Sequence, residues 1–165
     1  MRPSEIAEKY LGQTEKPGNM GFTDADFERK MNEVGFQKTH AWCAYFAELV
    51  FKEAYPEKFT ELDKLFSASA VQTFRNFYNA AYLVGYAPQK DTLVIWQKQV
   101  EGKPHWSGHA GIVTDVKSTW EFTTIEGNTN DGGGREGYIV AKHERKLYAE
   151  VKNGLKVLGF IQINP

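Results

Sequence analysis

The sequence predicts an α+β fold in which N-terminal helices pack on an antiparallel sheet of about five strands. Up to about residue 90 the apolar residues follow a helical period; beyond it, β-branched and aromatic residues alternate with polar ones and glycine is frequent. Helices that precede strands, rather than alternating with them, favour an α+β domain over βαβ units. A length of 165 residues suits one hydrophobic core. We therefore expect residues 1–165 to form a single domain.

The helices are predicted from caps, stop signals and apolar spacing. They are expected at residues 4–11, from a cap at Thr23 or Asp24 to about Val34, from about residue 40 to a point before Pro56, and around residues 70–83. The third helix is the clearest, because its apolar residues share one face: Trp42, Tyr45, Phe46, Leu49 and Val50. Glu48 and Lys52 have the spacing of a supporting ion pair on the other side of this helix.

The strands follow in the C-terminal half. They are expected at residues 93–96, 109–116, 120–126, 138–142 and 155–163. A flexible loop is expected at Asp131–Gly134, between two of these strands. Aromatic residues and this loop are candidates for the wall of a substrate groove. Trp106 and Tyr138 are such candidates, whereas Trp96 is expected to pack in the core.

Composition and charge exclude several classes of function. Aromatic residues make up 14% of the chain, which argues against disorder. The net charge of −1 provides no broad basic face, so we expect no nucleic-acid partner. No apolar run approaches the roughly 20 residues of a membrane span, so no membrane insertion is expected. The N-terminus has no apolar segment typical of a secretory signal, so we expect synthesis in the cytoplasm without a signal peptide.

Cys43 is the first residue with candidate chemistry, because it is the one cysteine of the chain. A single cysteine excludes an intramolecular disulfide and a multi-cysteine zinc site, and leaves a small buried hydrophobe or a nucleophile. Cys43 is expected as about the fourth residue of the third helix, with Thr39 as its cap. The positive end of a helix dipole stabilises a thiolate at such a position.

A nucleophilic cysteine needs a base, and the base needs an orienting group. Of the four histidines, His109 is the best candidate, because it opens a strand and the next strand ends in Glu126, Gly127 and Asn128. One register of this hairpin places Glu126 opposite His109, and a second places Asn128 there. The register between them turns both polar groups to the other face. The turn has no Asn-Gly signal that would select one.

A metal site is not expected. His105 precedes His109 by four residues, but Pro104 and Gly108 make this stretch a loop rather than a helix, and no third ligand is evident. Each residue of the proposed constellation also has an ordinary interpretation, as a strand-end histidine or as part of a Glu-Gly-Asn turn. Their occurrence together with the lone cysteine favours the catalytic interpretation.

Three segments resemble the CHAP family (cysteine, histidine-dependent amidohydrolase/peptidase), which belongs to the papain-like peptidoglycan hydrolases. They are Ala41–Phe46, Gly108–Val113 and Glu126–Asn128, and the wider resemblance runs from about residue 5 to residue 163. The resemblance implies a papain-like fold. It also implies that Cys43 is the nucleophile and His109 the general base. Glu126 would be the carboxylate that orients the imidazole, and Asn128 a further polar residue beside it.

The resemblance further implies bacterial peptidoglycan as the substrate and amide hydrolysis as the reaction. The bond is expected to be that of an N-acetylmuramoyl-L-alanine amidase or of a stem-peptide or cross-bridge endopeptidase. Trp106, Trp42 and Ser69 are the expected substrate-binding residues. Some members carry an Asp-rich calcium loop before the cysteine, but residues 32–40 lack it, so we expect neither a metal nor another cofactor.

Several settings and activities fit this resemblance. The protein is expected to act on the cell wall after release or export, as a phage-type endolysin or as an exported antibacterial amidase effector. An acyltransferase or deamidase on the same triad is an alternative, as is a non-catalytic wall-binding module.

Overall fold

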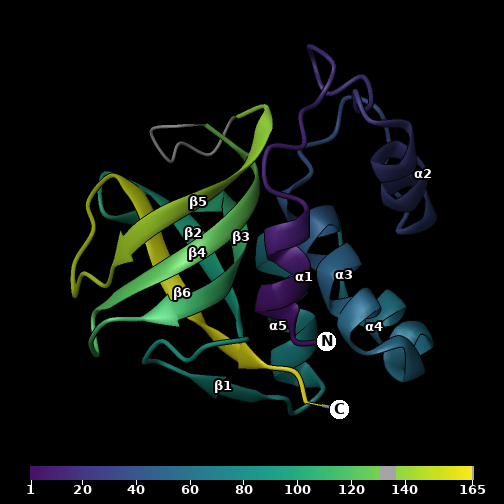
Figure 1. Cartoon of the computed structure of the whole chain (residues 1–165). Coiled ribbons are helices and arrows are strands. Elements are labelled where there is room, and N and C mark those ends of the chain that lie inside the picture. The colour runs from purple at the N-terminus through teal and green to yellow at the C-terminus, as the bar shows by residue number, and fades with distance from the viewer. Residues whose placement is uncertain (131–136, 165) are drawn as a thin grey trace.

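The computed structural model describes residues 1–130 and 137–164, in which helices come first and an antiparallel sheet follows (Figure 1). The predicted α+β fold with N-terminal helices is confirmed. The helices are α1 (Pro3–Lys9), α2 (Ala25–Glu33), α3 (Cys43–Ala54), the 3-10 helix η1 (Pro56–Lys58), α4 (Phe59–Leu65) and α5 (Ala70–Asn79). The strands are β1 (Leu83–Gly85), β2 (Leu93–Val100), β3 (Lys103–Val116), β4 (Glu121–Thr129), β5 (Ile139–Lys146) and β6 (Gly154–Gln162). The loop expected at Asp131–Gly134 lies outside the described residues.

The sheet has the strand order β1-β6-β2-β3-β4-β5, and all its neighbours are antiparallel. Figure 1 shows α1, α3 and α5 against one face of this sheet, with α2 standing further out beyond α3. Both faces are packed. The main core lies between sheet and helices and joins Phe46 and Val50 of α3 to Ile112 and Ile125 of the sheet. A second cluster covers the opposite face: Val94, Trp96, Val113, Phe122 and Phe160.

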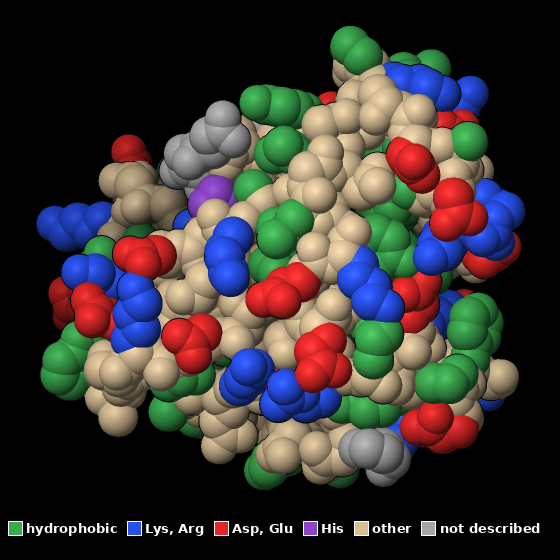
Figure 2. Space-filling model, in the orientation of Figure 1, with side chains coloured by type: hydrophobic (Ala, Val, Ile, Leu, Met, Phe, Trp, Pro, Cys, Tyr) green, Lys and Arg blue, Asp and Glu red, His purple; other side chains and the backbone are tan. Residues whose placement is uncertain are grey.

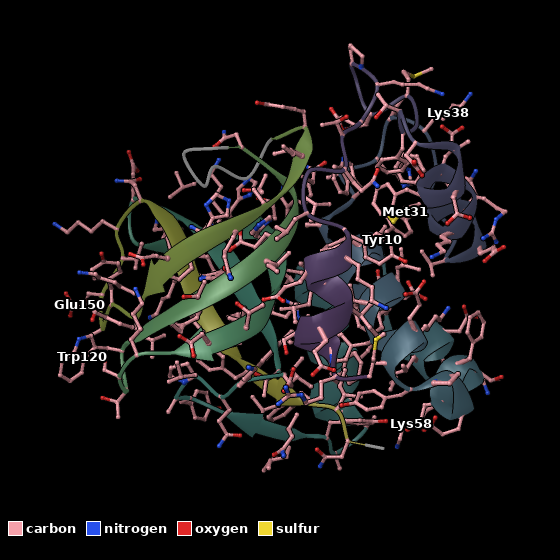
Figure 3. The ribbon with its side chains drawn as sticks, in the orientation of Figure 1. Tyr10, Met31, Lys38, Lys58, Trp120 and Glu150 are labelled. Carbon is pink, nitrogen blue, oxygen red and sulfur yellow. The ribbon has the colours of Figure 1, made fainter. Side chains whose placement is uncertain are left out.

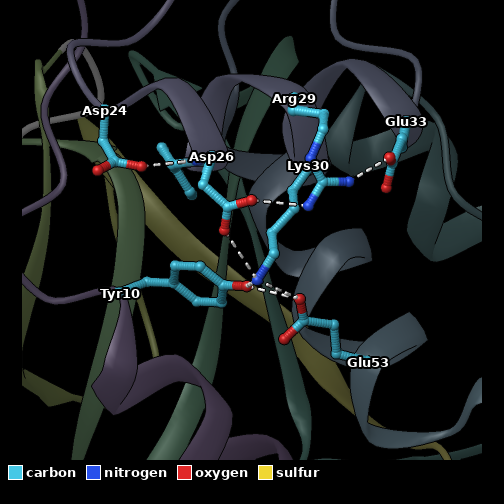
Figure 4. Close-up of polar contacts among 8 residues, drawn as sticks. Tyr10, Asp24, Asp26, Arg29, Lys30, Glu33 and Glu53 are labelled. Atoms are coloured by element: carbon cyan, nitrogen blue, oxygen red, sulfur yellow. Dashed lines mark hydrogen bonds and ion pairs between the residues drawn. The ribbon is translucent and has the colours of Figure 1, made fainter.

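Three helices are joined by one polar contact that the apolar pattern does not reveal (Figure 4). The hydroxyl of Tyr10, which follows α1, donates to Glu53 of α3 at 2.6 Å. Lys30 of α2 donates to the same hydroxyl at 2.9 Å and lies 3.1 Å from Glu53. Burial and the neighbouring Glu53 carboxylate raise the pKa of Tyr10 to about 12. Because Tyr10 stays neutral, the contact holds α2 in place throughout the physiological pH range.

The labelled residues in Figure 3 mark the two ends of the molecule. Met31 and Lys38 lie at the α2 end, where Met31 is buried. Trp120 and Glu150 lie at the opposite end, on the turns of the sheet. Acidic and basic side chains are intermixed over the face in Figure 2, so it has no patch of one sign. That distribution agrees with the net charge of −1.

Several boundaries differ from those expected. α5 ends at Asn79 rather than near residue 83, because Ala81 has a φ of 61°, and residues 83–85 form the edge strand β1. β2 continues to Val100 and β3 begins at Lys103, so the two strands form a longer hairpin than expected. α3 begins at Cys43, and Thr39 is not its cap: Thr39 has a φ of 73° and lies before the helix.

The expected pairing of Glu48 with Lys52 is confirmed, at 2.6 Å. Both residues are buried, which the sequence did not indicate. The reason is α4, which the sequence analysis did not predict and which packs over this side of α3. Asp63 of α4, whose side chain is 61% exposed, contacts Lys52 at 2.6 Å. The buried Glu48–Lys52 pair and Asp63 are called the α3–α4 cluster below.

Candidate active site

Cys43 is the first residue of α3, so its backbone N–H belongs to the helix turn that has no intrahelical acceptors. Cys43 is only 5% exposed. Burial raises the pKa of the Cys43 thiol, but the charge and hydrogen bond of His109 lower it by more, and the backbone N–H groups of Ala110 and Ala44 add to that effect. The thiol pKa is therefore below its ordinary value. A thiolate at this position is the form that acts as a nucleophile.

His109 and Glu126 form a fully buried pair beside this thiol. Nε2 of His109 lies 2.7 Å from Oε2 of Glu126. Within residues 1–130 and 137–164, no nitrogen or oxygen atom hydrogen-bonds to the buried Nδ1 of His109. It is the ring nitrogen that remains to exchange a proton with the thiol. Burial lowers the pKa of His109, but the charges of Glu126 and Cys43 outweigh it and raise the pKa to about 9.

These opposite shifts favour an ion pair. A raised histidine pKa and a lowered thiol pKa both favour transfer of the thiol proton to the imidazole, which gives imidazolium and thiolate. Burial alone would raise the pKa of Glu126, but the His109 and Arg145 charges hold it well below its ordinary range. The carboxylate is thus ionised at every pH at which the pair exists.

After a bulge between Val113 and Asp115, β3 and β4 pair Ile112 with Ile125, which is the second of the two registers left open by the sequence. Counted on in this register, Asn128 corresponds to His109 and Glu126 to Gly111, although the ladder itself ends at Ile112 and Ile125. Glu126 nevertheless reaches His109, because Gly111 has no side chain in the way. A Cβ atom at Gly111 would lie 2.8 Å from Cγ of Glu126. Gly111 is therefore a residue of the site that the sequence analysis missed.

The first residues of α3 lie at the point where β3 and β4 separate. Their pairing ends at Ile112 and Ile125, so the backbone of Ala110 is left to interact with Cys43. On β4, Gly127 lies directly on α3: a Cβ atom there would be 2.7 Å from both Trp42 and Phe46. This close approach brings the helix that carries the nucleophile onto the strand that carries Glu126.

Asn128 is brought to the same place but contacts the helix. It is buried, has a φ of 53°, and its Oδ1 accepts a hydrogen bond from the backbone N–H of Trp42 at 3.2 Å. Trp42 is the residue immediately before α3. The contact fixes the turn that presents Cys43, and the catalytic role expected for Asn128 stays a prediction.

The expected substrate-binding residues divide into two groups. Ser69 and Trp106 line a cavity of about 370 Å³ that also contains Cys43, and Trp106 is 74% exposed. The expectation that Trp42 contacts substrate is wrong. Its ring is fully buried, packs edge-on against Phe22 at 5.0 Å between centroids, and donates through Nε1 to Glu15 at 2.6 Å. The Trp42 ring therefore belongs to the core rather than to the wall of the cavity.

A second hollow of about 440 Å³ adjoins the first. Ala41 lines both, so the two hollows meet just before the nucleophile. The second is lined by Glu15, Asn19, Thr39, Ala41, Asn128, Gly137 and Tyr138. Tyr138, a candidate for the groove wall, lies there and is half exposed, whereas Trp96 is buried in the second core cluster as expected.

No metal ligand set is found in residues 1–130 and 137–164, where no three His, Cys, Asp or Glu side chains are grouped to hold an ion. Within the same residues, none of the helices is long and apolar enough to cross a membrane.

A comparison with models of protein families matches residues 35–128 to the CHAP domain. The matched segment contains Cys43, His109, Glu126 and Asn128 and covers more than half of the 165 residues. No curated protein and no solved structure matched the chain.

Proposed function

Since this chain belongs to the CHAP family, whose domains are generally cysteine- and histidine-dependent amidohydrolases, we propose that it cleaves an amide bond of peptidoglycan through Cys43, His109 and Glu126. Peptidoglycan is the substrate that family membership implies. The observation that carries the proposal is the geometry of the three side chains. The single thiol of the chain lies at a helix start beside an imidazole whose far nitrogen contacts a buried carboxylate at 2.7 Å.

The reaction follows from this arrangement. The Cys43 thiolate attacks the amide carbonyl, and the Cys43 backbone N–H, which has no helical acceptor, stabilises the oxygen that becomes negative. The His109 imidazolium gives its proton to the leaving nitrogen, and the C–N bond breaks. Neutral His109 then takes a proton from water, whose oxygen attacks the thioester and releases the acid and the thiolate. Glu126 keeps Nε2 occupied throughout and so fixes the ring orientation.

The two hollows fit an extended substrate with the scissile bond where they meet. The hollow with Cys43 has Trp106 and Ser69 on its wall. The other presents polar side chains, among them Asn19 and Thr39. A muramoyl-L-alanine bond and a bond within the stem peptide or cross-bridge require the same chemistry from the enzyme. A phage-type endolysin and an exported antibacterial effector are the two settings that we propose for it.

The test is mass spectrometry of the products from purified sacculi. The wild-type protein is expected to release new amine and carboxylate ends at one bond type, which identifies the bond. Cys43→Ala and His109→Ala are expected to release none. His105→Ala is the matched control, because His105 lies on the same strand but its Nδ1 contacts Ser107 rather than the triad. We expect it to retain cleavage within a few-fold.

Each other outcome has a defined meaning. Cleavage by Cys43→Ala at the wild-type rate would overturn the proposal. Products with an acyl group on a second amine would indicate a transferase on the same triad. Sedimentation with sacculi without any new ends would indicate a wall-binding module.

A further inference from the structure

Arg145 of β5 makes a two-point contact with the Glu126 carboxylate. Its Nε donates to Oε1 at 2.7 Å, and its Nη2 donates to Oε2 at 2.5 Å. Thr124 donates its hydroxyl to Oε1 at 2.5 Å, and His109 contacts Oε2. Both carboxylate oxygens therefore have two partners each. An arginine fork matches a carboxylate in this way with defined orientation.

Arg145 is not the cross-strand partner of Glu126, so its side chain extends along the sheet to reach the carboxylate. The register pairs Arg145 with Phe122, and alternation places Phe122, Thr124 and Glu126 on one face of β4. Trp96 supports the reach, since its ring lies 5.1 Å from the guanidinium carbon and 5.7 Å from the His109 ring. The Arg145 side chain is only 17% exposed. Packing thus holds it in the one conformation that meets Glu126.

We propose that Arg145 is a positioning residue of the triad: it fixes the Glu126 carboxylate against His109 and offsets part of the carboxylate's charge. This inference rests on the proposed function, because it assigns Arg145 to the same reaction. Arg145 is not among the residues that line the cavity with Cys43. Its effect on the reaction passes through Glu126 and His109.

The charge balance gives the inference a measurable sign. With Arg145, the thiolate, imidazolium, carboxylate and guanidinium sum to zero. Without it, the group carries one net negative charge. A more negative surrounding disfavours thiolate and favours imidazolium, so the apparent pKa values of Cys43 and His109 should both rise. The rise should be larger for His109, because Glu126, which would lose its partner, touches His109 directly.

The other groups around the pair are the same in the wild type and in the Arg145 variants, among them His143 of β5, which is paired with Thr124 and whose Nε2 lies 3.0 Å from the Thr129 hydroxyl oxygen. The pKa of His109 responds to Glu126 of β4 and Cys43 of α3. β2 contributes the neutral ring of Trp96, and α5 brings uncharged Ser69 and Ala70 to the cavity. His40 lines that cavity too, and its Nδ1 contacts the Tyr45 hydroxyl.

The experiment measures the rate of Cys43 alkylation by iodoacetamide against pH, which needs no peptidoglycan. Cys43 is the one cysteine, so the reagent reports on it alone. Two inflections are expected, one for the thiol and one for the imidazolium. In Arg145→Met both should move to higher pH, the imidazolium one by roughly one unit. In Arg145→Lys, which keeps the charge, both should stay within about 0.3 units of the wild type.

Sacculus digestion then measures the positioning effect. Arg145→Lys should still lose between about tenfold and a hundredfold in kcat/KM, because a point charge cannot hold both oxygens and small displacements of catalytic groups cost this much. Lys146→Met is the matched control, since Lys146 is the next residue of β5 and pairs with Glu121 instead. It should change neither the inflections nor kcat/KM by more than about twofold.

Unmoved inflections in folded Arg145→Met, or wild-type kcat/KM in Arg145→Lys, would overturn the inference. If Arg145→Met does not fold by circular dichroism, Arg145→Gln, which is neutral but keeps hydrogen-bond donors, takes its place. Failure of the proposed function is a different result: shifted inflections in the Arg145 variants with no cleavage of sacculi by the wild-type protein.

Discussion

Two ionic groups that each contain a buried glutamate differ in their chemical consequence. The active-site cluster comprises Cys43, His109, Glu126 and Arg145, and the α3–α4 cluster comprises Glu48, Lys52 and Asp63. Each places a carboxylate in the protein interior. Burial raises the pKa of Glu48 to about 7 despite the neighbouring Lys52, whereas two cationic partners hold the pKa of Glu126 well below its ordinary range.

The difference shows that burial of charge does not by itself make a site. Glu126 is saturated by donors and connects to a nucleophile that lines a cavity. The α3–α4 cluster connects two helices and reaches no nucleophile, so its effect is on packing. Substitutions in the first cluster should therefore change turnover, and substitutions in the second should change stability. The following predictions test that separation.

The largest effect is expected from Cys43→Ala. Without the sulfur no acyl-enzyme forms, and release of product ends from sacculi should fall by about 10⁴-fold or more. The free energy of unfolding should change by no more than about 1 kcal/mol, because the variant loses a single sulfur atom and His109 keeps its Glu126 partner. Urea unfolding monitored by circular dichroism measures the second quantity. A variant that loses activity only because it unfolds would contradict the separation.

Lys52→Met should give the reverse pattern. Removing the cation leaves the Glu48 carboxyl buried without its partner, which should cost about 3 kcal/mol of unfolding free energy. Turnover of the folded protein should stay within about threefold of the wild type, since the active-site cluster is untouched. The double variant Glu48→Leu/Lys52→Met should recover much of the lost stability, because it removes both buried charges. Loss of turnover without loss of stability would show that the clusters are coupled.

Gly111→Ala should lower turnover by between about tenfold and a hundredfold, an effect on catalysis from a residue with no chemistry of its own. The added methyl group would meet Cγ of Glu126 at 2.8 Å and the Trp96 ring at 3.3 Å, and so displace the carboxylate from His109. Gly85→Ala is the matched control: it is also in a strand, and its Cβ would meet nothing closer than 3.9 Å. Equal turnover in the two variants would show that Glu126 tolerates the displacement.

Gly111 also marks what the sequence could and could not predict. The order of helices before strands and the helix that carries Cys43 follow from apolar period, and the fold class is confirmed. The contact of His109 with Glu126 was expected from one of the two registers left open and from the family resemblance. The register did not follow, because the β3–β4 turn has no residue pair that selects one. With the register open, the need for a missing side chain at Gly111 was not visible.

The other omissions have a similar cause. α4 is a short helix whose apolar pattern is weak, with one fully buried residue, Leu62, so it was not predicted and the burial of Glu48 and Lys52 was missed. Arg145 lies beyond the expected end of its strand at residue 142, and no motif links it to Glu126. Trp42 was misplaced because proximity to the nucleophile in sequence does not say whether a ring faces the cavity or the core. Long-range packing decided each case.

The smallest effect is expected in the pH dependence of the unfolding free energy. The buried carboxyl groups of the two clusters should change this free energy in opposite directions as pH rises. A carboxyl whose pKa is raised on folding binds more protons in the folded state, so its contribution to stability falls as pH rises from its unfolded value through about 7. Glu48→Gln removes this titration. The difference in unfolding free energy, wild type minus Glu48→Gln, should therefore decrease between about pH 4.5 and pH 7, by about 1–3 kcal/mol. Glu126, whose pKa is lowered, contributes with the opposite sign, and its contribution is lost as pH falls through its lowered pKa. A difference that increases over the same pH range would mean that Lys52 stabilises ionised Glu48 by more than burial destabilises it, and the two carboxylates would then be equivalent.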